Sequence, residues 1–239
     1  MSRALLAPAV AALALVAAAC STPPPPPPDG PTDEPAPTRK RIVPSVESEI
    51  GALDANKVQA VFDAASGALK DCYTRGVGRI GFLAGDIKLA VRVGEDGGTR
   101  YAFVKDSTLG DRPTEACMLD VLRKQKWPKP EGGKEGTAET SFSFEPGDEE
   151  RPPVEWSEAR MGDGFKKARP ALAQCRQSAG AGPMKATLYV ETDGKALGVG
   201  VSGADAKSED AASCVVDLLM GVKYASPGSY AAKVTVAVE

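Results

Sequence analysis

The 239-residue sequence contains no histidine. Catalysis by a Ser–His or Cys–His pair is therefore excluded, and a zinc site would need four thiolates from distant positions because no CxxC pair occurs. The 29 Lys and Arg residues nearly balance the 32 Asp and Glu residues, which leaves no basic surplus for binding nucleic acid. We therefore expect no enzyme activity, metal, cofactor or nucleic-acid partner.

Long apolar runs are also scarce, and the main one is the stretch of residues 4–19 that follows Arg3. Because it is shorter than the ~20 apolar residues needed to cross a bilayer, residues 1–19 are typical of a secretory signal peptide. The ending VAAAC resembles the lipobox of bacterial lipoproteins, which are cleaved before the cysteine and lipidated on it. This resemblance implies a lipid on Cys20, and Ser21 in place of Asp implies the outer membrane. The alternative is a cleaved signal peptide with an incidental Cys20.

Proline is concentrated in residues 20–54, which include STPPPPPPDGPTDEPAP. Such a composition cannot build a packed core and favours an extended polyproline II spacer. At about 3.1 Å per residue, the spacer would reach up to roughly 100 Å from the membrane. A ligand for a PxxP-binding domain is the alternative interpretation.

The rest of the chain contains an internal repeat. The segment CMLDVLRKQKW (117–127) matches CVVDLLMGVKY (214–224), and FDAASGALKDC (62–72) matches FKKARPALAQC (165–175). Two segments that match at fixed offsets predict a tandem duplication. We assign a first repeat to residues 55–146, an acidic linker to 147–156 and a second repeat to 157–239.

The first repeat predicts the order helix, hairpin, helix, strand. Apolar residues recur at helical spacing over residues 58–73, and GDIKLAVRV (85–93) and TRYAFV (99–104) alternate on either side of a GEDGG turn. Asp111 begins a second helix that Trp127 ends, and residues 137–146 form a last strand.

The second repeat gives the same order, with strands at 184–191, 196–202 and 233–238. Pro170 predicts a kink or a late start in its first helix, and Ser208 is the expected cap of its second helix. Together the repeats predict an α+β fold of two tandem small domains, each with its helices packed on one face of an antiparallel sheet.

Four cysteines remain after Cys20 is set aside: Cys72, Cys117, Cys175 and Cys214. An even number in an exported chain indicates disulfides, and four cysteines allow three pairings. Because both cysteines of each repeat lie on the apolar stripes of its two helices, we predict one internal disulfide per domain, Cys72–Cys117 and Cys175–Cys214. Closing a loop of roughly 45 residues would stabilise such a small domain by about 4 kcal/mol.

The first repeat resembles the AgmX/PglI C-terminal domain of bacterial envelope proteins, which is itself similar to the TonB C-terminal domain. The resemblance rests on CYTRG, FLAGDIKLAVRVGEDGG and DSTLGDRPTEACMLDVLRKQKWPKP. The second repeat keeps the cysteines, the DG turn and the Lys-aromatic step. The resemblance implies a periplasmic protein-interaction module of envelope or motility machinery rather than a catalyst.

We therefore expect a lipid-anchored protein that presents two interaction domains to envelope proteins. By analogy with TonB-like domains, a partner strand would add to the last strand, which consists of Lys233, Val234, Thr235, Val236, Ala237 and Val238. The alternatives are a passive structural lipoprotein that associates with peptidoglycan and an uncharacterised enzyme.

Two motifs are open to a catalytic or nucleotide-binding interpretation. GVGRIG (76–81) and GVGVSG (198–203) both fit GxGxxG, but neither has the strand before and the helix directly after that a dinucleotide site requires. We interpret them as a helix exit and a close-packed strand. The carboxylates of Glu95 and Asp96 lie in a predicted hairpin turn, where solvation rather than catalysis is expected.

Overall fold

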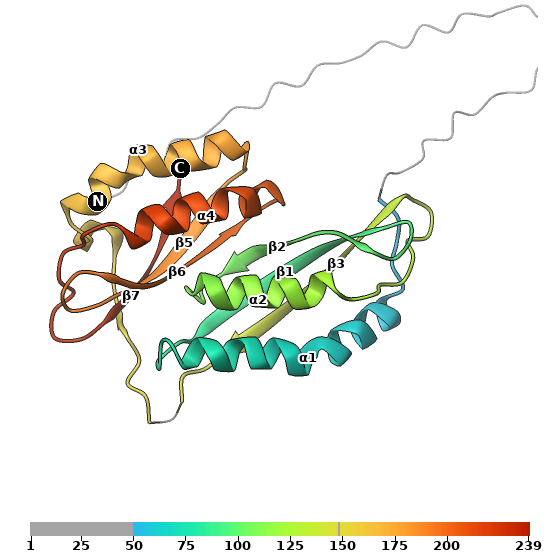
Figure 1. The fold of residues 1–239 in the computed structure, drawn as a ribbon, viewed down its shortest axis with the longest axis horizontal. Helices are drawn as coiled ribbons and strands as arrows, with labels where there is room; N and C mark the ends of the chain where they lie inside the picture. The colour runs from blue at the N-terminus through green and yellow to red at the C-terminus, as the bar shows by residue number, and fades with distance from the viewer. Residues whose placement is uncertain (1–49, 148) are drawn as a thin grey trace, which may run out of the picture. The chain divides into compact units, whose positions relative to one another are not determined.

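The computed structural model describes residues 50–147 and 149–239, which belong to one compact unit. The predicted signal peptide, Cys20 and residues 21–49 of the proposed tether lie outside the described residues, so the predictions made for them stay predictions. The fold is α+β, as expected, with helices and two sheets whose strands pair antiparallel except for the short parallel pair at Val154–Glu155 (Figure 1).

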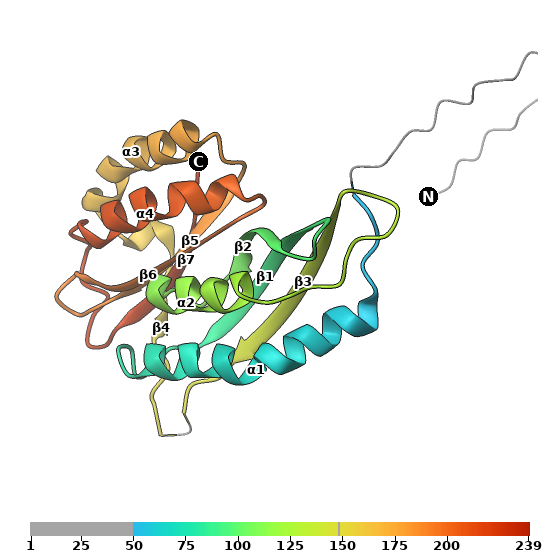
Figure 2. The ribbon, with the colours of Figure 1, turned by 45° about the vertical axis from the view of Figure 1, so that its right-hand side comes forward.

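The first half contains α1 (Ala55–Val77), β1 (Gly85–Gly94), β2 (Thr99–Ser107), α2 (Arg112–Arg123) and β3 (Glu135–Phe144). Its three strands are ordered β2-β1-β3. Figure 2 shows α1 and α2 running side by side along this sheet. The carboxylate of Asp54 begins α1 by accepting hydrogen bonds from the backbone N–H groups of Asn56 and Lys57 at 3.0 and 3.1 Å.

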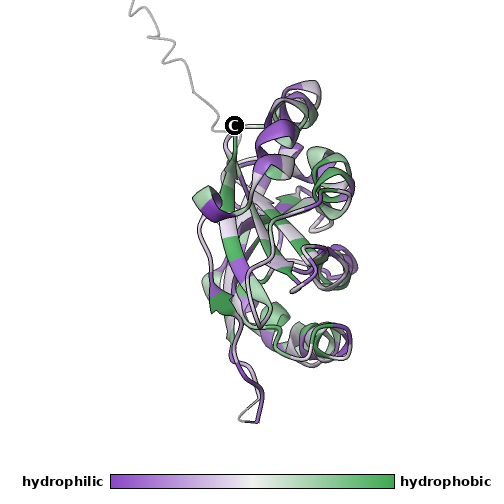
Figure 3. Ribbon diagram, turned by 90° about the vertical axis from the view of Figure 1, so that its left-hand side faces the viewer, coloured by the Kyte–Doolittle hydropathy of each residue, from purple (hydrophilic) through white to green (hydrophobic). Residues whose placement is uncertain are grey.

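The second half contains β4 (Val154–Glu155), η1 (Glu158–Arg160), α3 (Asp163–Ala179), β5 (Met184–Val190), β6 (Ala196–Gly203), α4 (Lys207–Met220) and β7 (Ala232–Val238). Its strands are ordered β4-β7-β5-β6. Apart from β4 and η1, the element order repeats that of the first half. Figure 3 shows α1–α4 on one side of the strands, with hydrophobic residues in both the helices and the strands.

The alternation of β1 positions the first core. Ile87, Leu89, Val91 and Val93 are all buried within one apolar cluster, whereas Lys88 and Arg92 are half-buried on the opposite face. A separate apolar cluster fills the second half. The predicted orientation of this strand is therefore confirmed.

Disulfide bonds are present, as predicted. Cys72 bonds to Cys117 and Cys175 bonds to Cys214, so each bond joins the two helices of one half. The expectation that all four lie on buried stripes is only partly correct. Cys72 and Cys175 are buried, but Cys117 is half-buried and Cys214 is exposed, because both lie at the side of their helix that faces the neighbouring helix rather than the sheet.

Pro170 does not delay the start of α3. This helix begins at Asp163 and continues through Pro170 to Ala179. Because Pro170 is exposed, the carbonyl of Lys166, which loses its helical donor, is on the solvent side. Of the two predicted alternatives, the late start is therefore wrong, and the kink stays a prediction.

The start of α4 also differs from the prediction. The side chain that accepts a backbone hydrogen bond at the start of α4 is that of Asp205, not that of Ser208. The Asp205 carboxylate accepts from the backbone N–H of Ser208 at 3.2 Å. The hydroxyl of Ser208 instead donates to the carbonyl of Asp205. In the first half, the second helix (α2) ends at Arg123 and not, as the sequence predicts, at Trp127.

The segments that precede each half are ordered against it, although the sequence assigned them to tether and linker. Ile50 bridges Glu135 in parallel at the start of β3. In the same way Val154 pairs in parallel with Ala232 at the start of β7. Residues 50–51 and 154–156 are thus not spacers, because their backbone groups pair with the last strand of each half. Ala52 pairs with Glu131, just before β3.

Candidate functional site

The predicted partner-binding strand is β7, and its outer side is open. β7 pairs with β5 over Ala232–Val238, whereas β4 covers its other side only at Ala232 and Lys233. The last backbone hydrogen bond on this side of β7 runs from the N–H of Trp156, just after β4, to the carbonyl of Lys233 at 2.9 Å. From residue 234 onward no strand among the described residues pairs with this side.

The backbone direction along β7 follows from that bond. The carbonyl of Lys233 points toward β4, and the backbone groups of successive residues in a strand alternate between its two sides. The N–H and C=O groups of Thr235 and Ala237 therefore point to the open side. Both of these side chains are exposed, whereas Val234, Val236 and Val238 are buried in the core. The predicted binding residues thus form an edge whose buried valines hold the strand in place.

The first half has an equivalent edge. The N–H of Gly51 bonds to the carbonyl of Glu135 at 2.6 Å, so this carbonyl points away from β1. Beyond it, β3 pairs only with β1 among the described strands. Each half thus leaves open the outer side of its last strand.

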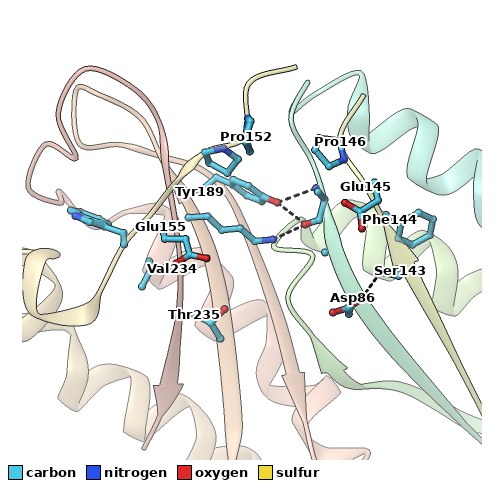
Figure 4. Close-up of a pocket in the computed structure, with 15 residues that line it drawn as sticks. Asp86, Ser143, Phe144, Glu145, Pro146, Pro152, Glu155, Tyr189, Val234 and Thr235 are labelled. Atoms are coloured by element: carbon cyan, nitrogen blue, oxygen red, sulfur yellow. Dashed lines mark hydrogen bonds between the residues drawn. The ribbon is translucent and has the colours of Figure 1, made fainter. Parts of the chain in front are cut away.

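A groove of about 650 Å³ lies beside β7, where the two halves meet. Figure 4 shows its walls: Ser143 and Phe144 at the end of β3, and Pro146 just after it, face Tyr189 of β5 and Thr235 of β7. Pro152, which precedes β4, and Glu155 of β4 close one side. Lys233 and Val234 also line it, so three of the predicted binding residues reach this groove.

Tyr189 joins the two halves at the base of the groove. Although it belongs to β5, its fully buried ring is part of the apolar cluster of the first half. Its hydroxyl donates to the carbonyl of Ala84 at 2.9 Å and accepts from the N–H of the same residue at 3.2 Å. Burial raises the pKa of Tyr189 to about 12, so the hydroxyl stays neutral and keeps both bonds at physiological pH.

Lys233 supports the same contact. Its ammonium donates to the carbonyl of Ala84 at 2.6 Å and lies 5.2 Å from the centre of the Tyr189 ring. Burial lowers the pKa of Lys233 to about 8, and the charge of Asp86 partly opposes this shift. Lys233 therefore stabilises the junction of the halves as well as lining the groove.

Glu115 is a buried acid that the predicted set of site residues does not include. It projects from α2, is 0% exposed, and is held between the halves. Its carboxylate accepts from the hydroxyl of Ser107 at 2.8 Å and from the backbone N–H of Val201 in β6 at 2.9 Å. The burial of Glu115 could have been predicted from helical spacing, because Met118, Leu119 and Leu122 lie on the same buried face of α2.

The two GxGxxG segments have packing roles. A Cβ on Gly76 would lie 2.2 Å from the hydroxyl oxygen of Thr114, and one on Gly198 would lie 2.5 Å from the side chain of Ile80. Asp96 belongs to the hairpin turn, where its carboxylate accepts from the N–H of Gly98 at 3.0 Å. That bond holds the pKa of Asp96 below its ordinary value. The arrangement around these residues supports turns and close packing.

The described part of the chain offers neither a cluster of metal ligands nor a membrane-spanning helix. Residues 50–147 and 149–239 contain no group of three or more Cys, Asp or Glu side chains placed to hold a metal ion. Within the same ranges, no helix combines the length and apolarity that a membrane span requires.

Comparisons of the chain with models of protein families, with curated proteins and with solved structures each found no match.

Proposed function

We propose that this chain is a non-catalytic, lipid-anchored envelope protein whose two halves are tandem interaction domains of the AgmX/PglI type, each with one disulfide. In this proposal an extended segment of an envelope partner adds to the open side of β7. The observation that carries it is the unpaired edge at Thr235 and Ala237, because exposed edge groups are a template for another strand.

The groove supports the same site. A segment that pairs with β7 would continue from the end of β4 and pass the groove, where Phe144, Pro146 and Trp156 offer apolar surface. Backbone hydrogen bonds along the edge would supply affinity, and side chains in the groove would supply specificity. The open side of β3 gives the first half a comparable edge.

A proline at residue 237 tests the role of the edge. Ala237 has an exposed side chain and an outward N–H, so Ala237→Pro removes a donor from the open side without removing a bond to β5. Ala237→Thr, which keeps the N–H, is the matched control. In-cell crosslinking followed by mass spectrometry should recover the same envelope proteins with the wild type and Ala237→Thr, and lose them with Ala237→Pro.

Retention of those partners by a folded Ala237→Pro variant would contradict binding at this edge. Recovery of peptidoglycan fragments without specific proteins would favour a passive structural lipoprotein.

A further inference from the structure

Glu115 forms a contact between the halves that no part of the proposed function uses. The carboxylate comes from α2 of the first half, and β6 of the second half covers it. If β6 moved away, water would reach a group that is now fully buried. The solvation of this one carboxyl group is thus linked to the docking of one half on the other.

The second half leaves room for this carboxyl group. A Cβ on Gly200 of β6 would lie 2.3 Å from Oε1 of Glu115 and 2.9 Å from the Cα of Gly110. Any larger residue at position 200 would displace either the carboxyl group or the backbone of the first half. Glycine at this point therefore lets β6 approach closely enough for its Val201 N–H to reach Glu115.

The charges around Glu115 are already paired with one another. Asp111, at the start of the same helix, pairs with Arg79 from the segment after α1. Arg112, on the helix itself, pairs with Glu209 of α4 in the second half, which Arg123 also approaches at 3.6 Å. Strand β6 contributes only backbone groups, Gly200 and Val201, and Ser107 of β2 is uncharged. Among the described residues no cation forms an ion pair with Glu115. The two hydrogen bonds and the nearby charge of Arg112 favour the ionised form, but the cost of burying the charge outweighs them.

Protonation removes that charge without breaking either contact. One oxygen of the neutral carboxyl group still accepts from the N–H of Val201. The other carries the proton, and its bond to Ser107 reverses direction: the carboxyl group donates to the Ser107 hydroxyl oxygen, which also accepts from the N–H of Leu109 and has a second lone pair. Both contacts therefore survive in the neutral form, whereas the ionised form adds the cost of a desolvated charge.

We propose that Glu115 is a proton-binding site that couples the docking of the two halves to pH, with protonation favouring the docked arrangement. The docked state is the one in which β6 covers Glu115. In the open state water solvates the carboxylate, and the pKa of Glu115 returns to its ordinary value of 4.5.

The sign follows from proton linkage. Burial raises the pKa of Glu115 from 4.5 to about 7 in the docked state, so this state binds more protons than the open one. The stabilisation is fully present below about pH 4.5 and is lost as the pH rises through about 7. From these two values, the equilibrium constant for opening should rise about tenfold between about pH 6 and about pH 8.

Amide hydrogen exchange at Val201 in the full-length protein tests this proposal, because its N–H is covered only while it bonds to Glu115. After correction for intrinsic exchange rates, protection should fall about tenfold between the two pH values. Glu115→Gln, which keeps both hydrogen bonds, should remove this pH dependence. Glu139→Gln should preserve it, because Lys105 and Lys88 hold the pKa of Glu139 below its ordinary value. Equal protection at both pH values in the wild type would overturn the proposal.

A direct titration keeps the proposal testable if Glu115→Gln fails to fold. The side-chain carboxyl carbon of Glu115 in the wild-type protein, followed by ¹³C NMR, should titrate with a midpoint near 7. A midpoint at the ordinary value of about 4.5 would show that the buried carboxylate is compensated, and the coupling would be refuted. Neither measurement depends on partner binding at β7, so their failure would leave the proposed function unaffected.

Discussion

Replacing Tyr189 by phenylalanine tests whether its hydroxyl fastens the two halves together. The ring would keep its place beside Phe82, whose centre lies 5.7 Å away, so the change removes little packing. The carbonyl of Ala84 would retain the ammonium of Lys233. The N–H of Ala84, however, would lose the hydroxyl oxygen that accepts from it at 3.2 Å.

The magnitude follows from that lost acceptor. Leaving a partly buried backbone donor without a partner costs about 1–3 kcal/mol. For a unit of this size each kcal/mol lowers the melting temperature by about 2–4 °C. Tyr189→Phe should therefore lower the free energy of unfolding by about 2 kcal/mol and the melting temperature by about 4–8 °C.

Tyr230→Phe is the matched control. The Tyr230 hydroxyl also donates to a backbone carbonyl, that of Arg151 at 3.0 Å, but in an exposed position where water can replace it. Its loss should change the stability by less than about 0.5 kcal/mol. Thermal and urea unfolding of the two variants would measure the difference. Equal losses of unfolding free energy in the two variants would refute the conclusion that the Tyr189 hydroxyl stabilises the contact between the halves.

Two further predictions concern a disulfide and an amine. Replacing Cys175 and Cys214 together by alanine opens a loop of 39 positions and should lower the free energy of unfolding in urea by about 4 kcal/mol; a loss below about 1 kcal/mol would contradict the loop-closure argument. Because burial lowers the pKa of Lys233 to about 8, its rate of acylation by a water-soluble ester should reach half its maximum near that pH. Peptide mass spectrometry would measure that rate, and a midpoint near the ordinary value of about 10.4 would contradict the burial of this amine.

The elements of each half were predictable from the sequence because they depend on local pattern. The alternation of Ile87, Leu89, Val91 and Val93 indicates which side of β1 is buried, and the structure confirms it. The exposure of Cys214 was not predictable in the same way. Helical spacing shows that a residue lies near the apolar stripe, but the position of the neighbouring helix determines whether it is covered.

The contacts between the halves were beyond the reach of the sequence. Tyr189 and Glu115 each lie in a pattern that indicates burial, but their partners, Ala84 and Val201, offer only backbone groups. Because nearly every residue carries the same backbone N–H and C=O groups, the sequence does not show which of them will accept or donate such a bond. Gly200 carried a weak signal, since glycine within a strand indicates close approach of another backbone, but the sequence could not show which backbone approaches.

The ion pair between Arg112 and Glu209 has a consequence for the ancestry of the chain. The two residues are 97 positions apart, as are Cys117 and Cys214, so they occupy the same place in the sequence repeat. In an assembly of two identical units, equivalent residues that meet at a twofold axis carry the same charge and repel each other. Under the proposed tandem duplication, opposite charges at that place mean that the two copies have diverged from each other. The ion pair between Arg112 and Glu209 therefore favours docking of the first half on the second half over docking of two identical halves.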